Sequence, residues 1–431
     1  MSVSKRSFLF LAVIIASANA WGQSASSPVS NFGIGEPYGN ALIHNQGMGG
    51  VGVSQPQYWF ANNQNPALLV FNRFTVFEAG IAGEQRKIKG DTISESNIGG
   101  TLNYLVTVFP VKVDRWTTSI GLMPFTNIDY GFSFDDVVRD HSTNIPIDSV
   151  PQSVINTGQG GLSQFYWSNG VRITPDMSVG VKAAYLFGSA DYIYANTVNN
   201  TGQPIQYIVT TQEKTTVKDF AFSVGYSFSK DSLFKKQDYR LSFGAVYNFS
   251  SDLKGKKVTN FFSQNLSGDT VEFQNLAEIK GSVYIPSSIT VGASISKGLQ
   301  WTAGTEFTYQ DWSGFKSVNS DNERGRGKQF KAAIGGEFTP DAQALESFFK
   351  RITYRIGGSI EQYPFLVNDK ELKDFGINFG FSLPAGRSSV DLAFKVGKRG
   401  DRKVNAVEES YFKVYFGITF NDQWFVKRKF D

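Results

Sequence analysis

Apolar residues alternate with small or polar residues along most of this 431-residue chain, from about Phe74 to Phe420. Between Tyr239 and Ser250, for example, the odd positions are Tyr, Leu, Phe, Ala, Tyr and Phe, and the even positions are Arg, Ser, Gly, Val, Asn and Ser. Side chains of a β-strand point to opposite faces in turn, so a period of two gives each strand one apolar face. The pattern therefore predicts an all-β chain built from amphipathic strands.

Two all-β architectures produce this alternation, a water-soluble β-sandwich and a transmembrane β-barrel. The composition favours the barrel, because 38 Phe and 18 Tyr accompany 43 Gly at a mean hydropathy of only −0.21. Aromatic residues are typical of lipid-facing girdles. The opposite faces mix Gly and Ser with single charges such as Lys182, Glu306 and Arg355, as expected of a wet or plugged lumen. After the N-terminal leader, no apolar run approaches the ~20 residues that a membrane-spanning helix needs.

The connections predict the number of strands. Short links, such as 174–176 and 296–298, alternate with longer polar links, such as 135–160 and 252–278. Outer-membrane barrels have this asymmetry, with short periplasmic turns and longer external loops. The run 283–295 contains Pro286 and is counted as one strand, because two strands would give an odd total. We therefore predict a 14-stranded antiparallel transmembrane β-barrel in the outer membrane of a Gram-negative bacterium, with both termini in the periplasm.

The chain divides into four predicted segments. Residues 1–20 carry Lys5 and Arg6, an apolar run at 8–16 and a closing Ala18-Asn19-Ala20, which indicates a signal peptide rather than a membrane anchor. Residues 21–72 are rich in Gly, Asn and Gln and show neither the two-residue period of a strand nor the 3.6-residue period of a helix. They predict an N-terminal plug, or hatch, inside the lumen, where irregular backbone is tolerated. Residues 73–421 form the predicted barrel, and residues 422–431 form a periplasmic C-terminal tail.

The predicted plug holds the residues that we expect to control passage through the lumen. Candidate plug and gate residues combine a glycine-rich run with a tight turn, at Gly47, Gly49, Gly50, Asn62, Asn65, Pro66 and Ala67. Inward-facing charges such as Lys182, Glu306 and Arg355 would either tether this plug through ion pairs or line a water-filled channel. A barrel of fourteen strands is wide enough for an aqueous lumen unless something fills it.

Residues that carry chemistry in enzymes are sparse in this chain. Cysteine is absent, and His44 and His141, the only histidines, lie far apart in sequence. The pattern predicts no enzyme, no catalytic residue, no metal site and no cofactor. The formal net charge of +4 is small and the basic residues are scattered, which argues against nucleic-acid binding. Acidic residues of the predicted loops, such as Asp135 and Asp136, suit a solvated rim that faces lipopolysaccharide.

Two motifs resemble the FadL family of outer-membrane transporters for long-chain fatty acids and other hydrophobic compounds. Met48-Gly49-Gly50 followed by Asn65-Pro66-Ala67 is similar to that family's hatch segment. The run Tyr-Ile-Pro-Ser-Ser-Ile at 284–289, continuing to Trp301 and Tyr309-Gln310-Asp311-Trp312, is similar to the family's middle strands. The predicted architecture, fourteen strands with a plug, is a third point of resemblance and spans nearly the whole mature chain.

The resemblance implies passive transport of a hydrophobic small molecule, which is held near the external loops and then released laterally when the plug moves. In that family the lateral gap comes from an inward kink of the third strand. Here the third predicted strand, 116–134, contains Gly121 and Pro124, and proline removes a hydrogen-bond donor from the ladder. Gly121 and Pro124 are therefore the candidate lateral-opening kink. The alternative is that Pro124 only marks a bulge or the end of pairing.

Two departures weaken the transfer of the family's function to this chain and are compatible with an alternative. The loops at 196–206 and 314–327 are largely polar, and the last strand is followed by a tail with Lys427-Arg428-Lys429. The alternative is a structural or occluding barrel subunit of an outer-membrane protein-export or surface assembly, with an export-machinery partner. The basic tail is then either a docking point or a simple extension. For transport we expect a monomer that contacts a hydrophobic small-molecule ligand, outer-membrane lipid and lipopolysaccharide.

Overall fold

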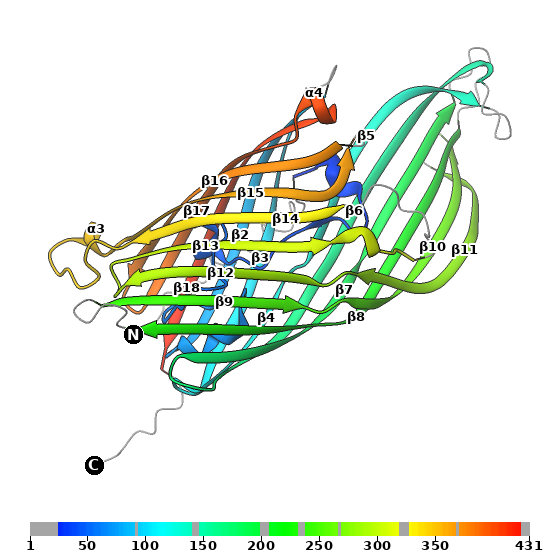
Figure 1. Cartoon of the computed structure of the whole chain (residues 1–431). Coiled ribbons are helices and arrows are strands. Elements are labelled where there is room, and N and C mark those ends of the chain that lie inside the picture. The colour runs from blue at the N-terminus through cyan, green and yellow to red at the C-terminus, as the bar shows by residue number, and fades with distance from the viewer. Residues whose placement is uncertain are drawn as a thin grey trace, which may run out of the picture.

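The computed structural model describes residues 25–90, 94–139, 146–198, 207–231, 238–265, 269–318, 327–367 and 370–423. The predicted signal peptide, His141 and the predicted tail beyond Gln423 lie outside the described residues. Of the helices in the described ranges, none is long and apolar enough to cross a bilayer. The strands form one antiparallel sheet that closes on itself (Figure 1).

Seventeen strand segments make the wall of the barrel. They are β2 (Thr75–Lys89), β3 (Ser94–Lys112), β4 (Trp116–Pro124), β5 (Thr126–Arg139), β6 (Pro146–Arg172), β7 (Met177–Val198), β8 (Tyr207–Asp231), β9 (Tyr239–Asn248), β10 (Ser251–Asn265), β11 (Thr270–Ile285), β12 (Ser288–Lys297), β13 (Trp301–Asp311), β14 (Lys328–Phe338), β15 (Thr353–Val367), β16 (Lys370–Ala385), β17 (Ser388–Arg399) and β18 (Glu408–Asp422). Three neighbouring pairs, β4 with β5, β9 with β10 and β11 with β12, are each one wall strand with a short interruption. The wall therefore has fourteen strands, and the predicted fold is confirmed.

The longest polar link of the sequence is strand and not loop. Residues 252–278, predicted as a loop, form most of the β10–β11 hairpin, and most of the predicted link 135–160 belongs to β5 and β6, so both predictions are wrong. β6, β7 and β8 contain 27, 22 and 25 residues, far more than the ~9–11 that cross a bilayer. Together with β5, β10 and β11 they form a tall sheet that rises beyond the other strands (Figure 1). A strand that leaves the bilayer no longer needs an apolar face, and its polarity alone does not identify a loop.

The outward face of the wall is apolar and uncovered. Large side chains such as Trp167, Phe222, Ile334 and Ile356 are each more than half exposed. Such a surface suits bilayer hydrocarbon and not water. Short links at 113–115, 298–300 and 386–387 gather at one end of the barrel, here named the turn end, and the tall sheet rises at the other, the loop end.

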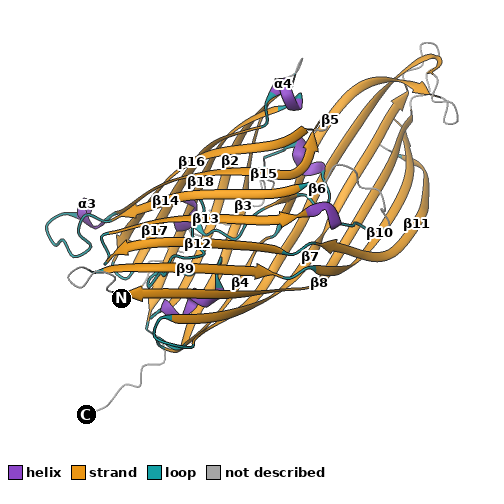
Figure 2. Cartoon of the chain, in the orientation of Figure 1, coloured by secondary structure: helices purple, strands orange, loops and turns teal. Residues whose placement is uncertain are grey.

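Residues 25–72, the segment predicted as the plug, lie inside the wall (Figures 1 and 2). The plug contains η2 (Pro28–Asn31), the two-residue strand β1 (Glu36–Pro37), α2 (Ile43–Gln46) and η3 (Pro66–Phe71). η3 begins where the Asn65 side chain accepts the backbone N–H of Ala67 at 3.0 Å, with Pro66 in the first turn. Apolar plug side chains such as Leu42, Met48 and Leu68 are fully buried.

A belt of wall glycines receives the plug. At each of nine inward-facing glycines an added Cβ would lie less than 3.0 Å from a plug atom. We name this set the glycine belt: Gly80, Gly170, Gly180, Gly225, Gly244, Gly335, Gly357, Gly380 and Gly417. Many belt members are direct cross-strand partners, as Gly170 with Gly180 and Gly335 with Gly357. The belt therefore runs around the wall at one level, which lets plug backbone touch wall backbone.

The plug backbone at Met48 lies very close to β14 and β15. An added Cβ on Gly357 would lie 2.2 Å from the backbone carbonyl carbon of Met48, and one on Gly335 would lie 2.1 Å from the Met48 oxygen. Gly358, the next residue along β15, pairs with the exposed Ile334 on the outward face. Its added Cβ would meet nothing closer than 3.6 Å.

We expect Gly357→Ala to destabilise the protein while Gly358→Ala does not. Overpacking of a closely packed core costs about 1–3 kcal/mol, whereas a substitution with free space changes stability by less than about 0.5 kcal/mol. Urea unfolding in lipid vesicles, followed by tryptophan fluorescence, measures both. Equal stabilities of the two variants would contradict the glycine belt.

Candidate functional site: the plug and the wall seam

Buried carboxylates of the wall hold the middle of the plug. Glu306 on β13 accepts the backbone N–H groups of Gly52 and Val53, each at 2.9 Å. Glu78 on β2 accepts the backbone N–H of Ala61 at 2.6 Å. Irregular backbone in a lumen needs such partners, because no ladder supplies them.

Further wall groups bond the plug near the belt. The Ser178 hydroxyl donates to the Ala67 carbonyl at 2.8 Å, and the Asn378 side chain donates to the Gln46 carbonyl at 2.7 Å. Lys182 donates to the Asn63 side chain at 3.3 Å. Of the two readings of the inward charges, these contacts favour the tether.

The structure places all seven predicted plug residues in this held region. Asn62 bonds the Gly52 carbonyl at 2.8 Å, and its oxygen accepts the N–H of Asn65. The Asn65 side chain also donates to the carbonyls of Val53 and Tyr226, at 2.8 and 3.0 Å, and so joins plug to wall. Gly47 touches the belt, Gly49 and Gly50 have positive φ, and Pro66 and Ala67 lie against Gly180.

An ion cluster holds the outer part of the plug, residues 25–42. We name Glu36 of β1 with Arg86, Asp374, Arg399 and Glu409 of the wall the Glu36 cluster. Arg399 forms two bonds to Glu36, one of them at 3.1 Å, and lies 3.4 Å from Asp374. Arg86 pairs with Glu409 at 2.5 Å. The Ser27 hydroxyl donates to Glu409 at 2.7 Å, and this contact adds a second plug residue to the cluster.

The pKa of Glu36 reports this pairing. Burial by itself would raise the pKa of the Glu36 carboxyl, but Arg399 and Arg86 outweigh burial and lower that pKa well below its ordinary value. A lowered pKa means that the ionised carboxylate stabilises the closed plug above the ordinary glutamate pKa. This contribution is lost as the pH falls towards the lowered pKa. The cluster is therefore fully formed at neutral pH.

Wall pairing is interrupted beside the Glu36 cluster. β3 pairs with β4 only through residues 105–112, and β4 ends at Pro124. Among the described residues, no pairing joins the remainder of β3 to β5. Instead β1 of the plug pairs with β5, Glu36 opposite Asn127 and Pro37 opposite Thr126. We name this interruption, between residues 94–104 of β3 and β5, the wall seam.

Gly121 and Pro124 lie beside the wall seam in different settings. Pro124 is the last residue of β4, and the break follows at Phe125, whose carbonyl accepts the backbone N–H of Tyr38 at 3.0 Å. Gly121 lies in regular pairing with Val106 and Tyr166. An added Cβ there would lie 2.4 Å from the Tyr166 hydroxyl oxygen, so this glycine leaves room for a tyrosine.

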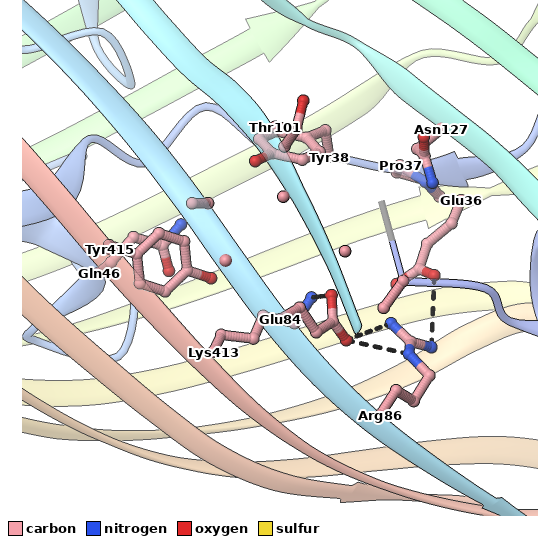
Figure 3. Close-up of a pocket in the computed structure, with 15 residues that line it drawn as sticks. Glu36, Pro37, Tyr38, Gln46, Glu84, Arg86, Thr101, Asn127, Lys413 and Tyr415 are labelled. Carbon is pink, nitrogen blue, oxygen red and sulfur yellow. Dashed lines mark hydrogen bonds and ion pairs between the residues drawn. The ribbon is translucent and has the colours of Figure 1, made fainter. Parts of the chain in front are cut away.

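A small polar cavity opens at the wall seam. Figure 3 shows Glu36, Glu84, Arg86 and Lys413 pointing into it, with Tyr38 above them. The cavity measures about 70 Å³ and is also lined by Gly99, Gly100 and Thr101 of β3. Charged groups that already pair with one another fill its wall, which makes it a site for water or a small polar group.

The sequence did not identify the glycine belt or the Glu36 cluster. The sequence shows glycines on the small and polar face of the strands. It does not show that these glycines lie at one level around the wall and form a contact surface. Glu36 lies in a segment without period, and Arg399 and Glu409 lie at strand ends that the sequence assigns to a link. Single charges on inward strand positions, such as Arg86, were the available signal.

In the part of the chain that the structure describes, His44 and the acidic residues do not form a metal centre. His44 is buried in the plug and stacks on Phe60 at 4.7 Å. Burial, followed by the charge of Arg355, lowers the pKa of His44 well below its ordinary value. Within the described ranges no group of three or more His, Cys, Asp or Glu residues could hold a metal ion.

We expect Glu36→Gln to loosen the outer plug. The chain has no cysteine, so a single Tyr38→Cys substitution reports access to the cavity. Maleimide labelling of this introduced thiol should be at least ~10-fold faster with Glu36→Gln, equivalent to about 1.4 kcal/mol. Glu84→Gln is the matched control, because Glu84 lines the same cavity but pairs with Arg86 and Lys413 of the wall. Equal labelling rates in both variants would show that the cluster does not hold the plug.

Comparison with solved structures finds barrels of similar fold. The Pseudomonas aeruginosa FadL homologue matches with a TM-score of 0.57 at 11% identity, over 89% of this chain and 98% of that one. The Pseudomonas putida toluene transporter TodX matches at 0.54 and 15%, over 90% and 100%. The CymD monoaromatic hydrocarbon channel matches at 0.54 and 14%, over 89% and 98%. The predicted resemblance to the FadL family is thereby confirmed in the fold, which fits an outer-membrane protein.

The sequence itself also matches a family. No match was found among curated proteins. A family model described as BamG matches residues 4–431. Since this match covers almost the entire sequence, the chain belongs to the BamG family.

Proposed function

We propose that this barrel moves hydrophobic small molecules passively across the outer membrane and releases them laterally through the wall seam. The observation that carries the proposal is the wall seam itself, where a plug strand pairs in place of a wall strand. Three barrels of similar fold are described as a FadL homologue, a toluene transporter and a monoaromatic hydrocarbon channel. An exit between β3 and β5 would deliver an apolar molecule directly to hydrocarbon.

Transport requires the outer plug to move. The cavity at the wall seam, about 70 Å³, is far below the ~300–1,000 Å³ of small-molecule sites, so the described arrangement is closed. The glycine belt and Glu306 hold residues 43–67, whereas β1 is held by the Glu36 cluster and by two paired residues. Withdrawal of residues 33–42 would therefore open the wall seam and leave the inner plug seated.

Gly121 and Pro124 have distinct roles in this proposal. Pro124 has no N–H and ends β4, so it limits pairing at the lower edge of the wall seam. Gly121 has no side chain, so Tyr166 packs closely against β4 three residues before this strand ends at Pro124. Both residues thus shape the opening, and neither needs to move for the plug to withdraw.

A disulfide between β1 and β5 tests the route. Pro37→Cys with Thr126→Cys joins two directly paired residues, and the chain has no cysteine of its own. In proteoliposomes we expect oxidation to reduce uptake of a radiolabelled monoaromatic hydrocarbon by at least ~10-fold, and reduction to restore it, because the locked strand closes the seam.

A wall-to-wall disulfide serves as the control. Ala293→Cys with Thr305→Cys joins β12 to β13, away from the wall seam. Uptake through this oxidised control should remain unchanged. If mass spectrometry confirms the β1–β5 disulfide and uptake persists, lateral release through the wall seam is excluded.

One observation favours a second function, a barrel subunit of an outer-membrane assembly. In the tall sheet β11 pairs with β10, and its other edge meets only the bridge from Tyr284 to Lys316 among the described residues. Val271, Phe273 and Leu276 of β11 are each more than half exposed. A long unpaired edge with exposed apolar side chains is a template for strand addition by a partner.

A charged residue on this edge separates the two functions. Under the assembly hypothesis the protein purifies in mild detergent with a stoichiometric partner, and Phe273→Lys removes that partner while hydrocarbon uptake is unchanged. Charged edge residues block strand pairing, which is the reason for this expectation. A partner-free native protein, by native mass spectrometry, would leave only the transport function.

A further inference from the structure

The link between β14 and β15 is unusual among the links at the turn end. It contains residues 339–352, which we name the α3 loop after its helix α3 (Phe348–Arg351). Other described links at this end, such as 113–115, 173–176, 298–300 and 386–387, have two to four residues. An antiparallel pair needs no more than such a short turn, so the additional residues of the α3 loop are not required to close the barrel.

The α3 loop has an ordered internal structure. The backbone N–H of Asp341 donates to the Lys350 carbonyl at 2.8 Å, which closes the loop on itself. The Asp341 carboxylate accepts the backbone N–H of Gln343 at 2.9 Å. At its base the hydroxyls of Thr339 and Thr353 bond at 2.8 Å, and Ile352 is buried.

The α3 loop leans over the outside of the barrel. The Tyr354 hydroxyl donates to the Phe349 carbonyl at 3.2 Å. Arg355, the next residue of β15, bonds Glu337 in the lumen, so Tyr354 faces outward by the alternation of the strand. Tyr354 also lies opposite Phe338, which is half exposed on the lipid-facing wall. Helix α3 therefore continues the aromatic outer surface and does not cover the lumen.

The loop presents apolar and basic side chains together. Leu345 is 95% exposed and Phe349 is 72% exposed, with Phe348 also exposed. Lys350 and Arg351 follow directly, and the Arg351 guanidinium lies 5.6 Å from the Phe348 ring. Large apolar side chains so exposed in an ordered loop are expected to be covered by something in the working protein.

We propose that the α3 loop is a membrane-interface anchor that inserts Leu345, Phe348 and Phe349 into the phospholipid leaflet at the turn end. Lys350 and Arg351 then lie at the level of the lipid phosphates. Aromatic and cationic residues in this combination are typical of the membrane–water interface. The outward lean and the continuity with the lipid-facing wall select lipid over a protein partner as the occupant.

Single cysteines test this anchor, because the chain has none of its own. Spin labels at Leu345→Cys and Phe349→Cys are compared in phosphatidylglycerol nanodiscs with a label at Gln343→Cys, an exposed position of the same loop. Collision with oxygen relative to a water-soluble nickel chelate should be at least ~5-fold higher for labels at positions 345 and 349 than for the label at position 343, because oxygen concentrates in hydrocarbon and the chelate stays in water. Heat-shifted gel mobility confirms that each variant folds.

The basic residues are tested in the same samples. Lys350→Glu with Arg351→Glu should move the label at position 349 towards water in phosphatidylglycerol nanodiscs, with no change in uptake of a hydrocarbon. Labels at positions 345 and 349 that meet the nickel chelate as often as the label at position 343 would overturn the proposal. Labels that leave water only when a second protein is added would likewise overturn it and assign the surface to that protein.

Discussion

Irregular backbone enclosed in a barrel needs hydrogen-bond partners and room, and the wall of this protein provides both at one level. Each buried backbone group left without a partner costs about 1–3 kcal/mol, so a plug without matching wall groups would not remain inside. Glu306 and Glu78 accept plug N–H groups, and Ser178 and Asn378 donate to plug carbonyls. The glycine belt supplies the room, because even one methyl group on Gly357 would overlap the Met48 backbone.

This constraint divides the plug into two parts with different attachments. Residues 43–67 touch the belt and form hydrogen bonds with several wall strands. Residues 25–42 face the tall sheet, where the Ser27 N–H donates to the Asp129 carbonyl and the Tyr192 hydroxyl donates to the Gly33 carbonyl. Their ionic attachment is the Glu36 cluster, and Glu36 and Arg86 of this cluster line the cavity at the wall seam. Motion in the outer part is therefore compatible with a fixed inner part.

Sequence reasoning succeeded where one period governs many residues. Alternation identified the wall strands, and the rule of an even number joined β11 to β12 through Pro286 and led to the correct count. It failed for 252–278, because a strand outside hydrocarbon carries polar residues on both faces. For the plug, sequence reasoning predicted the place in the lumen but not the contacts with the wall. Asn65 and Pro66 are recognisable as a turn, but they contact Tyr226 and Gly180, which lie on strands distant in sequence. Glu36 had no periodic context at all.

Hydrogen exchange of the protein in nanodiscs, followed by mass spectrometry, tests most directly whether one part of the plug is fixed while another moves. Peptides from 44–70 should exchange as slowly as wall strands such as β13, and peptides from 33–42 should exchange at least ~10-fold faster, since local opening reflects the lower stability of that segment. Equal exchange in both parts of the plug would contradict this account.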